Sequence, residues 1–321
     1  MTNTMNENEV LPTQTKTLGE CGKLAVEKHF RKILRHETEV IKDSDPEGVH
    51  QMRVGMRRLR SAISGFENAL DLPKAMAENK ISKIAQVLGS LRDLDVLKES
   101  LEHPNYHLPK SEQKSVNFVL ESLAKQRKIA LENVQATLKK EEYSRFKQAA
   151  KKWLQQPLYK GLGLITIEEV LPDLLMPAIS KFLLNPGWLV GKDLKLMNPD
   201  KLNEILKNHG EILHSLRKLA KKIRYQMELF TEFYGVDYQQ YLEDCQQIQT
   251  ILGEIQDSIV LAEFISSVLE SDMKQQMPTF NKKLAENRYN SWQQWQKFQQ
   301  KYLKLEVRQK FYLSVLYPVS E

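Results

Sequence analysis

The sequence HQMRVGMRRLR at residues 50–60 has a counterpart in HSLRKLAKKIR at residues 214–224, and the pattern that the two share is the strongest structural signal in the chain. Each copy begins with histidine and carries arginine or lysine at the same four later positions. The offset of 164 residues between the copies, from 50 to 214, continues downstream without a gap. It pairs Phe66 with Phe230, Ile84 with Ile248, Gly89 with Gly253, Asp93 with Asp257 and Val96 with Val260. One ungapped register over this length predicts an internal duplication of a helical unit.

Each copy, drawn as a helix, separates its basic side chains from its apolar ones. The basic faces hold His50, Arg53, Arg57 and Arg60 in the first copy, and His214, Arg217, Lys221 and Arg224 in the second. Arg58 and Lys222 lie away from the centre of these faces. From His50 to Arg60 the helix rises by about 15 Å, with a cation on every turn. No acidic residue interrupts either copy, so we expect a linear polyanion to complete the charge.

The composition favours an all-α protein. Of the 321 residues, 41% are hydrophobic, enough to fill a large core. Only 13 glycines and 12 prolines interrupt long stretches rich in leucine, lysine, glutamate and glutamine, a pattern typical of helices. The net charge of +6 is by itself only weak support for an anionic partner.

The cysteines and the N-terminal residues indicate where the chain works. Cys21 and Cys245 are too few for a disulfide framework, which favours a reducing compartment. Residues 1–17 are polar, and we expect a disordered tail there rather than a secretory signal or an anchor. No stretch approaches the roughly 18 apolar residues of a membrane span. We therefore expect a cytoplasmic protein with no membrane partner.

The chain divides into two helical halves around a region rich in proline and glycine at 157–177. Asp45-Pro46-Glu47 predicts a helix start, with an N-cap, a first-turn proline and an acid that suits the helix dipole. The long, charge-rich stretch at 111–155 predicts a solvated helical hairpin or arm. Gly89 and Gly253 predict bends. The other expected helices cover residues 18–41, 46–70, 74–88, 89–97, 208–234, 238–252, 253–269 and 280–316.

Neither histidine-bearing helix carries the ligands that a metal site needs. No Cys, Asp or Glu stands at ligand spacing from His50 or His214, so we expect no metal and no cofactor. Asp93 and Asp257 each follow a Leu-Gly pair, and we interpret them as groups that cap a helix end or pair with a neighbouring basic helix. With no acid cluster or nucleophile among the cations, we expect the chain not to be an enzyme.

Four segments resemble the CHAD family, the conserved histidine α-helical domain. They are VHQMRVGMRRLRSAISGF and LGSLRDLDVL in the first half, and LHSLRKLAKKIRYQMELF and LGEIQDSIVL in the second. The resemblance covers residues 18–316 and implies a single domain made of two antiparallel four-helix bundles, about 18–155 and 168–316, related by a pseudo-two-fold axis. It also implies a central basic channel, binding of inorganic polyphosphate and association with polyphosphate granules.

The resemblance further implies which residues contact phosphate. They are His50, Arg53, Arg57, Arg58 and Arg60 in the first half, and His214, Arg217, Lys221, Lys222 and Arg224 in the second. Many relatives carry a fused triphosphate-tunnel domain with an ExExK strand motif. The nearest stretch in this sequence, Glu37-Thr-Glu39-Val-Ile41, misses the lysine. This difference agrees with the expectation of binding without catalysis.

Two other functions remain as alternatives. A phosphohydrolase or polyphosphate-metabolising enzyme would need metal-binding carboxylates or a nucleophilic histidine among the cations. An RNA- or DNA-binding protein would use the same phosphate contacts, and would usually add aromatic or amide side chains, of which only Tyr225 and Gln51 are near. The predicted arm at 111–155 is a candidate surface for a protein partner.

The two histidines predict a pH dependence of binding. Neighbouring cations should hold the pKa of each imidazole below about 6.5 in the free protein. A bound polyanion should raise it. We therefore expect proton uptake on binding, and an affinity that rises as the pH falls from about 8 towards 6.

Overall fold

The structure, a computed structural model, describes residues 16–103, 108–192 and 198–319. Within these ranges the chain consists of helices and their connections, with two isolated β-bridges and no strand. The predicted all-α fold is confirmed. Most of the predicted tail, residues 1–15, lies outside the described residues. None of the described helices is both long and apolar enough to cross a membrane.

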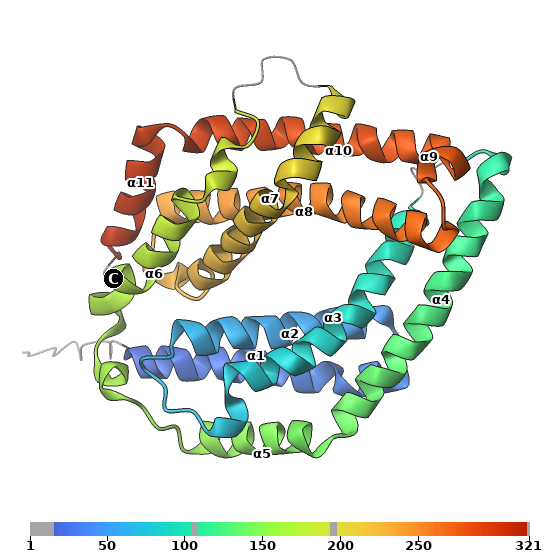
Figure 1. Ribbon diagram of the computed structural model, residues 1–321. Helices are drawn as coiled ribbons and strands as arrows, with labels where there is room; N and C mark the ends of the chain where they lie inside the picture. Colours follow the sequence, from blue (N-terminus) through green and yellow to red (C-terminus); the bar gives the residue numbers. More distant parts are fainter. Residues whose placement is uncertain (1–15, 104–107, 193–197, 320–321) are drawn as a thin grey trace, which may run out of the picture.

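The first half of the chain contributes five helices, which Figure 1 shows along the bottom and the right side of the molecule. They are α1 (Leu18–Lys42), α2 (Pro46–Gly65), α3 (Glu78–Leu101), α4 (Lys110–Lys139) and α5 (Glu141–Gln155). α2 packs against both α1 and α3. The basic helix of this half is therefore held between two neighbours.

The second half forms the upper part of the molecule in Figure 1. It holds α6 (Ile167–Leu183), α7 (Pro199–Met227), α8 (Val236–Leu269), α9 (Met273–Gln276), α10 (Pro278–Tyr302) and α11 (Leu305–Leu316). Four 3-10 turns complete the described helices: η1 (Lys74–Met76), η2 (Gly161–Leu164), η3 (Pro186–Leu189) and η4 (Thr231–Phe233). α7 packs against α6 and α8, so the second basic helix is flanked in the same way as the first.

Both basic helices start at a polar cap followed by proline. The Asp45 side chain accepts a hydrogen bond from the backbone N–H of Glu47 at 2.8 Å, as the sequence predicted for α2. Asn198 accepts one from the backbone N–H of Lys201 at 2.8 Å and starts α7. Each cap satisfies one of the N–H groups that a helix start leaves unpaired.

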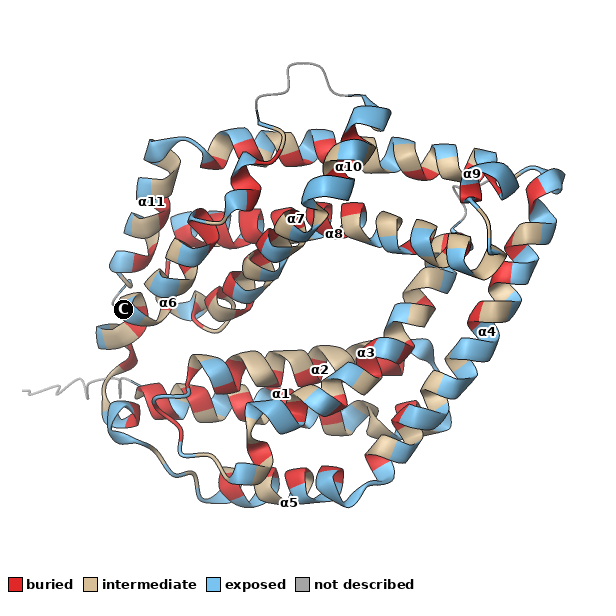
Figure 2. Cartoon of the chain, in the orientation of Figure 1, coloured by how far each residue is buried: buried red, intermediate tan, exposed pale blue. Residues whose placement is uncertain are grey.

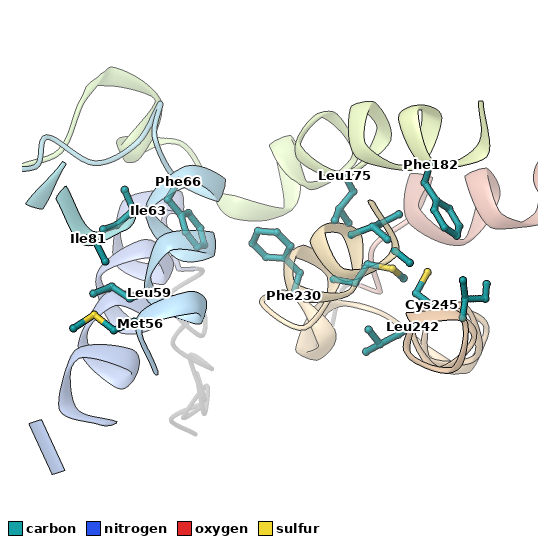
Figure 3. Close-up of a cluster of buried hydrophobic side chains, with 14 of the residues drawn as sticks. Met56, Leu59, Ile63, Phe66, Ile81, Leu175, Phe182, Phe230, Leu242 and Cys245 are labelled. Carbon is teal, nitrogen blue, oxygen red and sulfur yellow. The ribbon is translucent and has the colours of Figure 1, made fainter. Parts of the chain in front are cut away.

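The apolar faces of the two basic helices meet in one core. On α2 this face holds Met52, Met56, Leu59 and Ile63, all buried, as predicted. Phe66, at the end of α2, packs edge-to-face on its repeat partner Phe230, with ring centroids 5.5 Å apart. Figure 3 shows these two rings facing each other between the halves. Burial of a large apolar side chain contributes about 1.5–3 kcal/mol, so this contact helps to join the halves.

The solvated arm expected at 111–155 is not what the structure shows. The stretch breaks at Lys140, which has extended backbone angles, and α4 and α5 do not fold back on each other as a hairpin. α4 instead runs from the first half to the second, and Figure 2 shows its outer side exposed. Its Val116, Val119 and Leu123 are buried in a second core with side chains of α8, α9 and α10. The apolar stripe of α4 therefore joins the first half of the chain to the second half.

Several expected boundaries were also wrong. α3 and α8 run through Gly89 and Gly253 without a bend, and α6 continues through Pro172 and Pro177. α2 ends at Gly65 rather than Leu70, because Leu70 pairs with Tyr159 in an isolated bridge. α7 begins at Pro199 rather than near Asn208, because Leu202 and Leu206 are buried and extend its apolar face. At Leu70 a tertiary contact overrides the local helix signal, whereas α7 begins at the local signal of Asn198 and Pro199.

Candidate anion-binding site

The cations of α2 and α7 gather around one buried aromatic ring. Tyr225 of α7 is 3% exposed. The guanidinium carbon of Arg57, from α2, lies 4.9 Å from the centre of its ring, and that of Arg224 lies 4.5 Å away. Arg58 lies 5.9 Å from the same centre. A ring face attracts cations, so Tyr225 positions guanidinium groups of both halves next to each other.

A cavity of about 360 Å³ opens beside this ring. Arg57 and Arg60 of α2 line it together with Lys221 and Lys222 of α7. These four predicted site residues, two from each half, are thus brought together. Lys218 and Glu78 also line the cavity. The arrangement presents cations from two separate helices to one space.

Lys221 lies at the electrostatic centre of the site. Its burial, together with the guanidinium groups of Arg57, Arg53, Arg217 and Arg224, lowers the pKa of its ammonium group to about 7. Two of these arginines belong to α2 and two to α7. A lysine whose charge is so strongly disfavoured indicates a site with an excess of positive charge and little water.

The two histidines lie in similar surroundings. Burial lowers the pKa of His50, and the guanidinium of Arg92, on α3, adds to the effect. Burial also lowers the pKa of His214, with Lys218 as the strongest neighbouring cation. The predicted lowering of the pKa is confirmed for both imidazoles. Desolvation, however, contributes more than the cations that the sequence indicated.

The paired aspartates contact the basic helices. Asp93 of α3 lies 3.6 Å from Arg53, and Asp257 of α8 lies 3.8 Å from Arg217. Both lie in helix interiors, so the pairing part of the prediction is confirmed and the capping part is wrong. The two carboxylates also lie near one another. Burial raises the pKa of Asp257, Arg217 lowers it, and Asp93 raises it further.

The repeated glycines have a role other than the predicted bend. A Cβ atom on Gly253 would lie 3.2 Å from Nε of Arg217, and one on Gly89 would lie 3.5 Å from Nε of Arg53. The arginines of α7 and α2 therefore pass directly over the backbone of α8 and α3. At Gly253 the added atom would crowd the arginine, so glycine lets Arg217 lie where it does, whereas the distance at Gly89 is an ordinary van der Waals contact.

Acidic residues from outside the two motifs neutralise part of the basic stripe. Arg60 donates to Glu78 at 2.7 Å, and Glu228 accepts contacts from Arg58 at 3.0 Å and Arg224 at 3.6 Å. We expected no acidic residue to compensate the basic stripe, and this was wrong, because the fold brings Glu78 and Glu228 to it from other parts of the chain. Several buried polar atoms still have no hydrogen-bond partner among the described protein atoms. They are Nε of Arg57, Arg58, Arg92 and Arg217, Nδ1 of His214 and the hydroxyl of Tyr225. Nε of Arg224 has only the ion-pair contact with Glu228.

Arg58 faces away from the cavity beside Arg57. It lines a different, adjoining cavity together with Lys28 and His29 of α1. Arg58 therefore does not belong to the same row as Arg53 and Arg57, whereas Lys222 does line the first cavity.

Sequence reasoning missed three contributors to the site. Tyr225 was considered only as a base-stacking residue, and its burial under guanidinium groups appears only in the fold. Arg92 lies on α3, outside the repeated basic motif, and reaches His50 through packing. Lys218 aligns with Val54 when the two copies are compared, so it is not one of the basic positions that the copies share. In the described residues no three or more His, Cys, Asp or Glu side chains gather closely enough to hold a metal ion.

Comparisons with known proteins agree with this architecture. A family model described as the CHAD domain matches residues 24–266. The chain is similar to the crystal structure of the CHAD domain from the plant Ricinus communis, with a TM-score of 0.54 and 23% identity over 94% of this chain and 92% of that one. It is also similar to PptA from Streptomyces chartreusis, with a TM-score of 0.60 and 14% identity over 93% of this chain and 99% of that one. At these identities the similarity concerns the fold. No match was found among curated proteins.

Proposed function

The chain belongs to the CHAD domain family, and from this membership we propose that it binds inorganic polyphosphate in the basic cavity between α2 and α7. The observation that carries the proposal is the position of Lys221 among Arg53 and Arg57 of one half and Arg217 and Arg224 of the other. Cations held so close together and partly buried repel one another. An anion of high charge density, in contact with all of them, stabilises the site.

The unpaired guanidinium donors support phosphate as that anion. Nε of Arg57 and Nε of Arg217 have no hydrogen-bond acceptor among the described protein atoms. Phosphate oxygens accept charge-assisted hydrogen bonds from arginine, often two at a time. A chain of phosphates offers such oxygens at every unit, which matches a row of cations along two helices. The first half supplies mainly arginine and the second supplies Lys221 and Lys222 as point charges.

We also propose that the halves are two copies of one bundle related by a pseudo-two-fold axis. Contacts between equivalent residues support this relation, since such contacts arise near a two-fold axis. Phe66 packs on Phe230, Asp93 acts on Asp257 and Arg57 acts on Lys221. The matching pairs Arg53–Asp93 and Arg217–Asp257 agree with the same axis. The axis would make the two basic helices line one channel from opposite sides.

Nucleic acid is the competing ligand. Among the described residues that line the cavity, only Tyr225 is aromatic. The guanidinium groups of Arg57 and Arg224 already lie over its ring. A base would therefore have to displace an arginine in order to stack there. In a competition at physiological salt, we expect polyphosphate to displace labelled single-stranded RNA completely, and RNA to displace labelled polyphosphate poorly. Equal displacement in both directions would favour the nucleic-acid alternative.

We propose that binding occurs without turnover. The carboxylates nearest the site, Asp93 and Asp257, are paired with arginine. Among the described residues, no contact shows a nucleophilic side chain next to a general base in this site. Purified protein incubated with polyphosphate and magnesium or manganese should release no more phosphate than a heat-treated control. Release that a Lys221→Met substitution abolishes would establish an enzyme instead. Binding without turnover suits a factor that resides on cytoplasmic polyphosphate granules.

Substitution of Gly253 by alanine should separate stability from binding. Alanine in a helix interior is favoured over glycine by about 1 kcal/mol, so the melting temperature should rise by about 2 °C. The added Cβ would lie 3.2 Å from Nε of Arg217 and should push that guanidinium aside. We expect the affinity for polyphosphate to fall about threefold.

Gly210 provides the matched control for this substitution. It lies in α7, and a Cβ at this position meets nothing within 4 Å. Gly210→Ala should therefore raise the melting temperature in a similar way and leave the affinity unchanged. Unchanged binding by the Gly253→Ala variant would show that the close approach of Arg217 to α8 is not needed.

A further inference from the structure

A second basic surface lies on the face of α2 that adjoins the proposed channel. A cavity of about 260 Å³ is lined there by Lys28 and His29 of α1 and by Arg58 of α2. Ser61 and Tyr225 line both this cavity and the one beside Arg57. The two cavities are therefore neighbours. Between them lies the Tyr225 layer, which consists of the Tyr225 ring and the guanidinium groups of Arg57 and Arg58.

α1 extends this surface as a row of charge. Lys28, Lys32 and Arg35 stand four and three residues apart, so they share one face of the helix. The row rises by about 10 Å along the helix axis. The ion pairs found on the described part of α1 involve other side chains, namely Lys23, Arg31 and His36 with Glu27 and Glu39, and Glu37 with Lys147. Among residues 16–103, 108–192 and 198–319, no carboxylate lies at ion-pair distance from Lys28, Lys32 or Arg35.

These cations act on one another and on Arg58. Burial lowers the pKa of Lys32, and Arg58 and Arg35 lower it further, while Glu47 opposes them. Burial, with Arg58, Lys28 and Lys32, lowers the pKa of the buried His29 to about 4. The repulsion has the same origin as in the channel, and an anion laid along the row would relieve it.

The acids near this surface do not cancel its charge. Glu228 pairs with Arg58 at 3.0 Å, and Glu232 pairs with Lys16 at 3.2 Å. Both lie at the end of the cavity towards the second half. The row formed by Lys28, Lys32 and Arg35 continues beyond them along α1 and keeps an excess of positive charge.

We propose that a long polyphosphate chain leaves the channel past the Tyr225 layer and continues along Lys28, Lys32 and Arg35 of α1. This inference rests on the proposed function and adds a preference for chain length. A ligand short enough to fit within the channel does not reach α1, whereas a long one gains contacts with the second surface. Affinity then increases with chain length beyond what filling the channel provides.

The test compares two ligands on a triple variant. Lys28→Gln, Lys32→Gln and Arg35→Gln remove the row without touching a residue placed in the channel. The matched control removes three exposed charges of α4 by Lys125→Gln, Lys128→Gln and Lys139→Gln. Binding of tripolyphosphate and of long-chain polyphosphate is measured at one salt concentration, and circular dichroism checks that both variants keep their helices. Three exposed contacts predict a loss of about tenfold.

The expected result is a tenfold loss for long-chain polyphosphate on the α1 variant, with tripolyphosphate binding unchanged and the α4 variant like wild type. Wild-type affinity of the α1 variant for the long ligand would overturn the inference and leave the channel proposal intact. An equal loss for both ligands, or an equal loss on the α4 variant, would overturn it as well. Failure of the wild-type protein to bind either ligand would instead defeat the proposed function.

Discussion

Replacement of Arg53 and Arg57 by glutamate will lower the affinity for polyphosphate by about 100-fold or more, and so will replacement of Arg217 and Lys221. Each charge-assisted hydrogen bond to a phosphate contributes about 1.5–3 kcal/mol, and each double variant removes two such donors and adds repulsion. The prediction depends on a site built from both halves. Arg53 and Arg57 lie on α2, yet they act on the ammonium group of Lys221 on α7.

Titration calorimetry at fixed salt would measure these losses. The matched control is Lys125→Glu with Lys128→Glu on the exposed side of α4, which makes the same change in net charge away from the site. Circular dichroism should show unchanged helix content in all three proteins. If either double variant of the site keeps wild-type affinity, the ligand does not span the two halves, and the shared channel is wrong.

Raising the pH from about 7 to about 9 will weaken polyphosphate binding by up to about tenfold per pH unit. Burial and the surrounding guanidinium groups hold the pKa of Lys221 at about 7 in the free protein. A bound polyanion favours the charged ammonium group and raises that pKa. Below pH 7 Lys221 is protonated with or without ligand, so it adds no pH dependence there. Above pH 7 each binding event must take up a proton, and the affinity falls.

Arg53, Arg57, Arg217 and Arg224 face Lys221 from α2 and α7, and Asp257 faces it from α8. The arginines stay charged across this range, so they do not compete with lysine for the titration. Lys221→Arg should keep the affinity at pH 7 and abolish the dependence between pH 7 and pH 9. Calorimetry in two buffers of different ionisation enthalpy would count the protons. No uptake by the wild-type protein at pH 8 would contradict this account of Lys221.

The free protein should respond to pH in the opposite direction. The ordinary pKa of lysine is 10.5, so the unfolded chain binds the Lys221 proton more tightly than the folded chain does. Lys221 therefore adds to the stability of the unliganded fold as the pH rises above about 7. Replacement of His50 and His214 by glutamine should leave both effects in place. It should remove only the pH dependence that lies between the lowered pKa of the two imidazoles in the free protein and their raised pKa in the complex, at pH values below about 8.

The sequence alone predicts that the chain is helical and shows that one basic motif occurs twice. The offset of 164 residues identifies which positions are equivalent, and the helical period separates a basic from an apolar face. Met52, Met56, Leu59 and Ile63 are buried as this period requires. Local signals at Asp45 and Pro46 also set the start of α2. The helical period and the cap depend on residues close together along the chain, and the repeat is a comparison of one stretch of sequence with another, so none of these properties needs the tertiary structure.

The tertiary structure decided which of the ten predicted phosphate contacts share a space. Arg57, Arg60, Lys221 and Lys222 line one cavity, whereas Arg58 lines another with α1. Gly253 does not mark the predicted bend between two helices, but is the position at which the Arg217 side chain passes over the backbone of α8. Glu78 and Glu228 supply acids that neither motif contains. A sequence repeat specifies equivalent positions, but it does not specify how two helices cross. The crossing of α2 and α7 fixes which side chains meet and how far water is excluded, and so it sets the pKa of Lys221.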